Sequence, residues 1–162
     1  HKYFEGQAPT QWTPEALTDA GAKAGLAAVV ERAATTAVEC PKAWDDLRLN
    51  EALDHVWNVV ERANEFVDRT KPWELGKDPE KLAELGTVLS ALLETLRLVA
   101  IWAWPAMPHK CEELWDMLGL EGSPRDQRGE AAQPRFGAAA PRALGETRIL
   151  FPRIDLKQVA GP

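Results

Sequence analysis

Residues 64–73 read NEFVDRTKPW, and this stretch decides how the chain is organised. Proline cannot continue a helix, and it disfavours helical geometry at Lys71, the residue before it. The stretch therefore predicts the last turns of a helix that ends before Pro72. Trp73 follows the break, where we expect its indole ring to lie flat and half exposed.

Two polar side chains lie one turn apart upstream of this break. Asn64 and Asp68 are spaced i, i+4 and so share a helix face. Asn64 is also predicted to lie on the apolar stripe of the helix, where an unpaired amide costs about 1–3 kcal/mol. That stripe comprises Leu53, Val56, Trp57, Val60 and Val67. An amide, a carboxylate and a flat ring at one helix end suit an unstacked nucleic-acid base.

A purely structural interpretation accounts for the same residues. An asparagine on a helix stripe is usually a core polar group with satisfied hydrogen bonds, and a Pro-Trp step after a helix usually ends the helix and fills the core. Spacing alone favours this structural interpretation over the binding one.

Composition narrows the class of protein. The chain has 162 residues and a net charge of −6, which argues against a generic basic nucleic-acid binder but not against a local site.

Cys40 and Cys111 lack metal-ligand spacing; one long-range disulfide is an alternative, but two free buried thiols in a reducing compartment are favoured. We find no apolar run of transmembrane length and no signal peptide, and we expect a cytoplasmic protein. Because it begins at His1 without Met, we interpret the chain as a piece of something longer.

Periodicity and helix signals predict an all-α antiparallel bundle in residues 1–120. Thr13 and Pro14 are the expected start of a first helix that reaches residue 46, where Pro41 either kinks it or splits it. Asn50 is expected to cap the second helix. That second helix is expected over residues 50–69. A third helix, 79–104, is the most apolar and is expected to be central. A fourth, 109–118, is expected to stop at Gly119. Residues 121–162 are interpreted as a long loop to residue 147 and an extended tail that packs on the bundle.

No residue pattern indicates catalysis or metal binding. The histidines are scattered, and neither cysteine has a neighbouring histidine in the sequence. Positive charge does collect around the ring, because Arg69, Lys71 and Lys77 bracket it. These three could contact the phosphates of an RNA strand while the ring and Asn64 contact a base, although such residues also simply solvate a helix end.

The order of these motifs resembles the anticodon-binding domain of methionyl-tRNA synthetase. The likeness rests on Ala63-Asn64 with Asp68 and Pro72-Trp73, on Trp104-Pro105, on Lys2-Tyr-Phe-Glu-Gly near the start, and on Leu150-Phe-Pro-Arg-Ile-Asp155 near the end. The resemblance implies a helical bundle from a class I synthetase. It also implies that Trp73, beside Pro72, stacks on an unstacked anticodon base, and that Asn64 and Asp68 shape the pocket.

The chain also departs from that family. An Asn and an Arg that help read the anticodon, and the catalytic domain, would lie before His1. We therefore expect no cofactor in this chain, whereas the parent ligase is expected to use ATP and Mg. The expected partners are a methionine tRNA anticodon stem-loop and the catalytic domain of the same protein, with no membrane. The alternatives are a helical protein-interaction module, the anticodon domain of another class I synthetase, and a metal-binding enzyme bundle.

Overall fold

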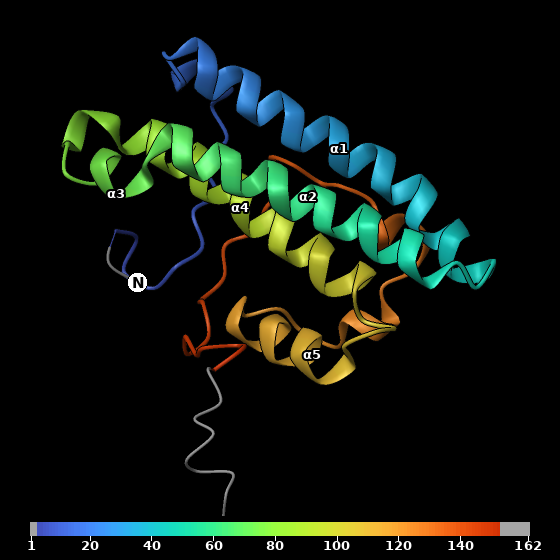
Figure 1. The fold of residues 1–162 in the computed structure, drawn as a ribbon. Helices are drawn as coiled ribbons and strands as arrows, with labels where there is room; N and C mark the ends of the chain where they lie inside the picture. The colour runs from blue at the N-terminus through green and yellow to red at the C-terminus, as the bar shows by residue number, and fades with distance from the viewer. Residues whose placement is uncertain (1–2, 153–162) are drawn as a thin grey trace, which may run out of the picture.

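A computed structural model describes residues 3–152, and over that part of the chain the protein is an all-α bundle without strands (Figure 1). The predicted fold class is confirmed. The α-helices are α1 (Ala20–Asp45), α2 (Leu49–Thr70), α3 (Pro72–Leu75), α4 (Leu82–Trp102) and α5 (Pro108–Met117). The 3₁₀ turns are η1 (Pro14–Ala16), η2 (Pro79–Lys81), η3 (Pro124–Asp126) and η4 (Gly129–Ala132).

Helix α4 is the centre of the bundle. It packs against α1, α2, α3 and α5, and most of its side chains are buried. The expectation that no apolar run reaches transmembrane length is wrong, because Pro79–Trp102 is long and apolar enough, with a mean hydropathy of 1.5. Two thirds of the most apolar 18 residues of this segment is buried inside the protein, as is usual for a core helix.

The first long helix starts later than the sequence predicted. Pro14 opens only the three-residue turn η1, and α1 begins after Asp19, whose Oδ1 accepts a hydrogen bond of 2.8 Å from the backbone N–H of Ala22. Leu17, which lies between η1 and α1 along the chain, is fully buried in the core. We attribute the later helix start to this tertiary contact. Pro41 lies inside α1, which continues through it unsplit.

Helix α2 turns a different face to the core from the one predicted. The inward residues are Ala52, Val56, Val59, Ala63, Phe66 and Thr70. Asn64 is exposed, so its placement on a buried stripe is wrong, and Trp57 is 45% exposed. Asn50 does not cap this helix, because Arg48 occupies the N-cap position. Gly25 of α1 decides the packing: a Cβ there would lie 3.0 Å from the Phe66 ring, so the two helices approach closely at this point.

The end of α2 is a left-handed turn. Lys71 adopts φ 43° and ψ 64°, and its N–H donates to the carbonyl oxygen of Val67 at 2.8 Å. Pro72 lacks an N–H and has a fixed φ, so it can open the next helix directly. The break before Pro72 is confirmed, and α3 leaves it in a new direction (Figure 1).

A strap formed by residues 3–17 runs along α4. Ser90 Oγ lies 2.7 Å from the carbonyl oxygen of Pro9, and the N–H of Thr13 donates to Thr87 Oγ1 at 3.0 Å. The strap also pairs with the later chain, where the N–H of Ala8 donates to the carbonyl oxygen of Arg142 at 2.8 Å. Ser90 and Thr87 of α4 thus provide hydrogen-bond partners for backbone groups of the strap, which has no helix or sheet to pair them.

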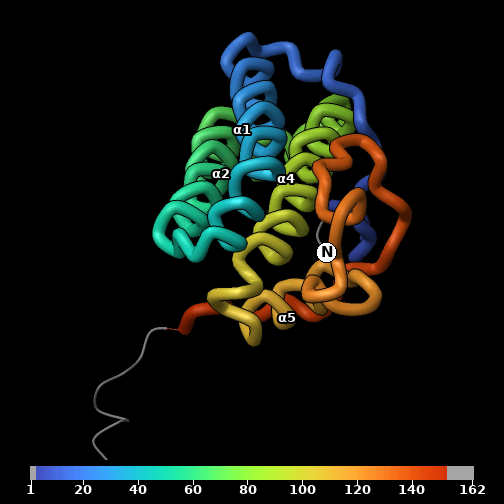
Figure 2. The backbone as a smooth tube through the Cα atoms, turned by 90° about the vertical axis from the view of Figure 1, so that its right-hand side faces the viewer, coloured from blue at the N-terminus to red at the C-terminus, as the bar shows by residue number. Residues whose placement is uncertain are grey.

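The loop from residue 121 to 147 lies on the same side of α4 as the strap, away from α1 and α2 (Figure 2). Arg97, only 7% exposed, donates to the carbonyl oxygens of Ala131 and Gln133 at 2.8 and 2.7 Å. Gly119 ends the α5 region with φ +65°, as predicted for a helix stop, and its missing Cβ lets the Ala143 carbonyl approach. Beyond the loop Leu150 packs partly on the core, while Ile149 and Phe151 are exposed. The expected tail residues 153–162 lie outside the described residues, as do His1 and Lys2.

Both cysteines are free and buried, as favoured from the sequence. Burial raises the pKa of the Cys40 thiol to about 11, partly offset by a hydrogen bond with Trp44. Burial also raises the pKa of Cys111 to about 11, with a smaller contribution from the Glu112 carboxylate. The folded state therefore favours the protonated thiols.

We expect Lys71→Val to destabilise the protein by about 1–2 kcal/mol, because a β-branched side chain is strained in left-handed backbone geometry. Lys71→Asn is the matched control, since asparagine tolerates that geometry and also removes the charge. Urea unfolding followed by circular dichroism measures both free energies. Equal stabilities for the two variants would contradict the strained turn.

We expect iodoacetamide at pH 8 to leave both cysteines unmodified until urea unfolds the chain, because only thiolates react.

The raised pKa values of the two cysteines stabilise the fold fully below pH 9, and that contribution is lost as pH rises through 11. The free energy of unfolding should therefore fall between pH 9 and 11 more steeply in the native sequence than in a Cys40→Ala, Cys111→Ala variant. Parallel pH curves would refute this assignment.

Candidate nucleic-acid interface

Trp73 lies on a short helix that is anchored from beneath. Leu75 is buried in the core, and Gly76 lies against the Tyr3 ring, where a Cβ would come within 2.3 Å of Cε1. These contacts fix α3 against the strap. They leave the Trp73 side chain 48% exposed, so the expected half-exposed indole is present. The interpretation of this ring as a core plug is therefore wrong.

Asn64 and Asp68 line one shallow groove of about 470 Å³ on the outer face of α2. Both side chains are exposed, and no hydrogen bond between described side chains involves either of them. The shared face predicted from their spacing is present. Trp73 does not line this groove, so the structure brings Asn64 and Asp68 together without bringing the ring into the same hollow.

The groove beside Asn64 is acidic. Its wall carries the carboxylates of Asp54, Glu61, Glu65 and Asp68, together with Trp57, Asn58 and Val60. Arg62 lies next to it and pairs with Glu65 at 2.7 Å. Carboxylates and amide oxygens accept hydrogen bonds from base amino groups, whereas the carboxylates repel phosphates. The groove therefore suits the edge of a base and not the backbone of a nucleic acid.

A second hollow, of about 480 Å³, lies at the end of α2 and is lined by charges of both signs. Arg69 and Lys71 line it, as does Lys81 from η2. These cations are mixed with acidic groups of the same hollow, namely Asp19, Glu74, Asp78 and Glu84. Lys77 is exposed but lines neither hollow, and no ion pair between described residues involves Arg69, Lys71 or Lys77.

Sequence reasoning missed two neighbours of this surface. Trp57 was assigned to the core, yet its half-exposed ring lines the groove with Asn64. A helical wheel with Phe66 and Val59 inward would have placed it outside. Lys81 follows the Asp78 cap closely, and only the turn η2 brings it to the α2 end. Among residues 3–152, no three His, Cys, Asp or Glu side chains are arranged so that they could hold one metal ion.

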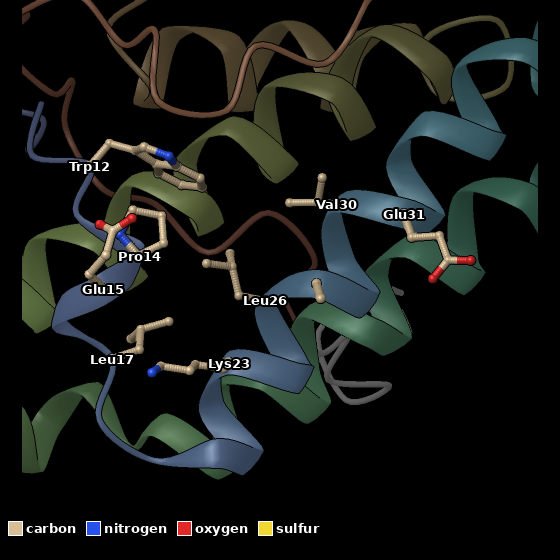
Figure 3. Close-up of a pocket in the computed structure, with 9 residues that line it drawn as sticks. Trp12, Pro14, Glu15, Leu17, Lys23, Leu26, Val30 and Glu31 are labelled. Atoms are coloured by element: carbon tan, nitrogen blue, oxygen red, sulfur yellow. The ribbon is translucent and has the colours of Figure 1, made fainter.

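A largely apolar groove of about 630 Å³ lies between the strap and α1 (Figure 3). Trp12 and Leu17 of the strap face Leu26 and Val30 of α1 across it. Lys23, Glu15 and Glu31 add charge to its rim. This surface would serve the alternative of a protein-interaction module, and it was not predicted from the sequence.

Three comparisons with known proteins bear on these surfaces. A family model described as the anticodon-binding domain of tRNA ligase matches residues 27–135. The methionine–tRNA ligase of Clostridium acetobutylicum is 37% identical over 124 residues, which are 74% of this chain and 19% of that protein. The enzyme of Clostridium perfringens is 32% identical over 160 residues, 98% of this chain and 23% of that protein. The chain thus spans about a fifth of the length of these relatives.

The fold is also shared with solved structures. The apo form of Mycobacterium tuberculosis methionyl-tRNA synthetase superposes with a TM-score of 0.76 at 25% identity, over 95% of this chain and 29% of that one. Its complex with methionyl-adenylate gives the same TM-score. The family resemblance inferred from the sequence is confirmed. Since the family model covers more than half of the chain, this chain belongs to the anticodon-binding domain family of tRNA ligases.

Proposed function

We propose that the chain reads the anticodon of a methionine tRNA as part of a methionine–tRNA ligase. The observation that carries the proposal is the half-exposed indole of Trp73 on a helix anchored by Leu75 and Gly76. A fixed, open ring is what base stacking requires, because the ring loses little freedom when the base binds. The methionine–tRNA ligases among its relatives support the choice of methionine over another class I synthetase.

The roles of the neighbouring residues follow from their charges. Pro72 orients the stacking ring, and Asn64 and Asp68 accept hydrogen bonds from the edge of a base. Arg69, Lys71 and Lys77 contact phosphates near the end of α2. In a chain with a net charge of −6, such local cations must offset long-range repulsion of the RNA.

The remaining expectations concern the whole ligase. A catalytic domain elsewhere in the same protein would bind methionine and ATP, since the Mycobacterium tuberculosis relative has been solved with methionyl-adenylate. The use of Mg and a cytoplasmic location stay predictions. This chain would supply anticodon recognition alone.

A second candidate function is a protein-interaction module. The apolar groove between Trp12, Leu17 and α1 favours it, because such grooves accept apolar side chains of a partner helix. The two candidates differ in one measurement. A domain that reads an anticodon binds a methionine anticodon stem-loop better than one with a changed anticodon at the same salt concentration, whereas an interaction module shows no preference.

We expect Trp73→Ala to lower tRNA affinity of the ligase by about 1–3 kcal/mol, the usual contribution of one stacked base. Leu49→Ala is the control, because it removes another exposed apolar side chain, at the opposite end of α2 from Trp73 and outside the groove with Asn64. Filter binding and aminoacylation kinetics report the loss. The stacking role is wrong if both variants lose the same affinity or if neither does.

We expect Lys71→Gln and Lys77→Gln each to reduce the slope of log affinity against log salt by about 0.7, the value for one phosphate contact on a single strand. Lys23→Gln, which removes a charge beside the apolar groove, should leave the slope unchanged. Binding of the anticodon stem-loop at four salt concentrations gives the slopes. An unchanged slope in the Lys71 and Lys77 variants would exclude them as phosphate contacts.

A further inference from the structure

A polar cavity lies on the loop side of α4, away from the α2 end. It has a volume of about 340 Å³, near the lower end of the range for small-molecule sites, about 300–1,000 Å³. Three arginines line it, namely Arg97, Arg135 and Arg142. The acidic side chains in its wall are Glu94 and Glu121, so the lining carries an excess of positive charge.

Glu94 is already fully engaged. Its two oxygens accept from Arg97 Nε and Nη2, both at 2.8 Å, and Oε1 also accepts from the backbone N–H of Arg135 at 2.6 Å. Arg97 also donates from Nη1 to the carbonyl oxygen of Ala131 and from Nη2 to that of Gln133. This buried ion pair therefore neutralises itself and builds one wall of the cavity. It does not neutralise the other two arginines.

Arg135 and Arg142 keep donors available. Arg142 Nε donates to the carbonyl oxygen of Leu118 at 2.7 Å, and Arg135 Nη2 donates to that of Ala131 at 2.9 Å. No other side-chain hydrogen bond and no ion pair among residues 3–152 involves either guanidinium. Burial lowers the pKa of Arg142, which the Glu94 carboxylate raises and the Arg97 charge lowers, so an anion beside it would relieve an unfavourable charge.

The rest of the lining is apolar, apart from Ser90, whose hydroxyl is bonded to the backbone of the strap. Leu93 of α4, Leu120 after α5, and the segment from Ala138 to Pro141 complete the wall. A ligand that fits this cavity combines an oxyanion, held by the forked donors of arginine, with a small apolar body.

We propose that this cavity binds a small phosphate monoester, with its phosphate between Arg135 and Arg142 and its organic part against Leu93 and Leu120. Such a ligand joins the loop to α4, because Arg135 and Arg142 belong to the loop and the apolar wall belongs partly to the helix. The site is independent of the proposed anticodon contacts. Figure 2 shows the loop on the opposite side of α4 from α2.

The test is a calorimetric titration of the 162-residue chain with phenyl phosphate and with inorganic phosphate, at constant ionic strength. Amide chemical shifts locate the binding. Arg142→Gln and Arg135→Gln should each weaken phenyl phosphate binding by about tenfold, because each removes a charged hydrogen-bond donor. Arg128→Gln is the matched control, since Arg128 lies on the same loop, is exposed and does not line the cavity.

Tighter binding of phenyl phosphate than of inorganic phosphate, with shifts confined to residues 93–97, 118–121 and 135–142, is the expected result. Arg142→Lys should retain only part of the affinity, because an ammonium lacks the planar fork. The proposal is overturned if the native chain shows no saturable binding. It is equally overturned if the Arg128 variant loses as much affinity as the other two, or if the shifts lie elsewhere.

Discussion

The burial of α4 is the constraint on which the rest of the structure depends. An apolar side chain that stays in water forgoes about 1.5–3 kcal/mol, and α4 presents such side chains on every face. Helices α1 and α2 cover one side, while the strap and the 121–147 loop, which have little regular structure, cover the other (Figure 2). These irregular covers need hydrogen-bond partners for their backbones, and Thr87, Ser90 and Arg97 of α4 provide them.

The proposed RNA surface is a consequence of the same packing. The short helix α3 inserts Leu75 into the core and meets Tyr3 through Gly76, so its remaining face, with Trp73, stays outside. Carboxylates collect along the outer face of α2, and the hollow where that helix ends carries cations and carboxylates together. The carboxylates suit the hydrogen-bond donors of an unstacked base, whereas the cations at the helix end are the groups that would meet its phosphate.

Errors in the sequence-based prediction arise where several local signals compete. Thr13 and Pro14 form a good helix start, yet Leu17 is buried in the core, and the long helix α1 begins only after Asp19. Helix α2 has apolar residues on two adjacent stripes, and periodicity cannot choose between them. Contact with Gly25 chooses the stripe with Phe66, and Asn64 and Trp57 then face solvent. Likewise, only the turn η2 brings Lys81 to the hollow that Lys71 lines.

Local chemistry in the sequence was enough to determine the helical class, the break before Pro72 and the stop at Gly119, because each depends on residues close together along the chain. The order of several such motifs along the chain was enough to indicate its family. Only the tertiary structure decided which face of α2 is buried, that Arg97 and Glu94 seat the long loop, and that Arg135 and Arg142 share a cavity. Those outcomes depend on close packing and on charge neutralisation between segments tens of residues apart, which no local pattern encodes.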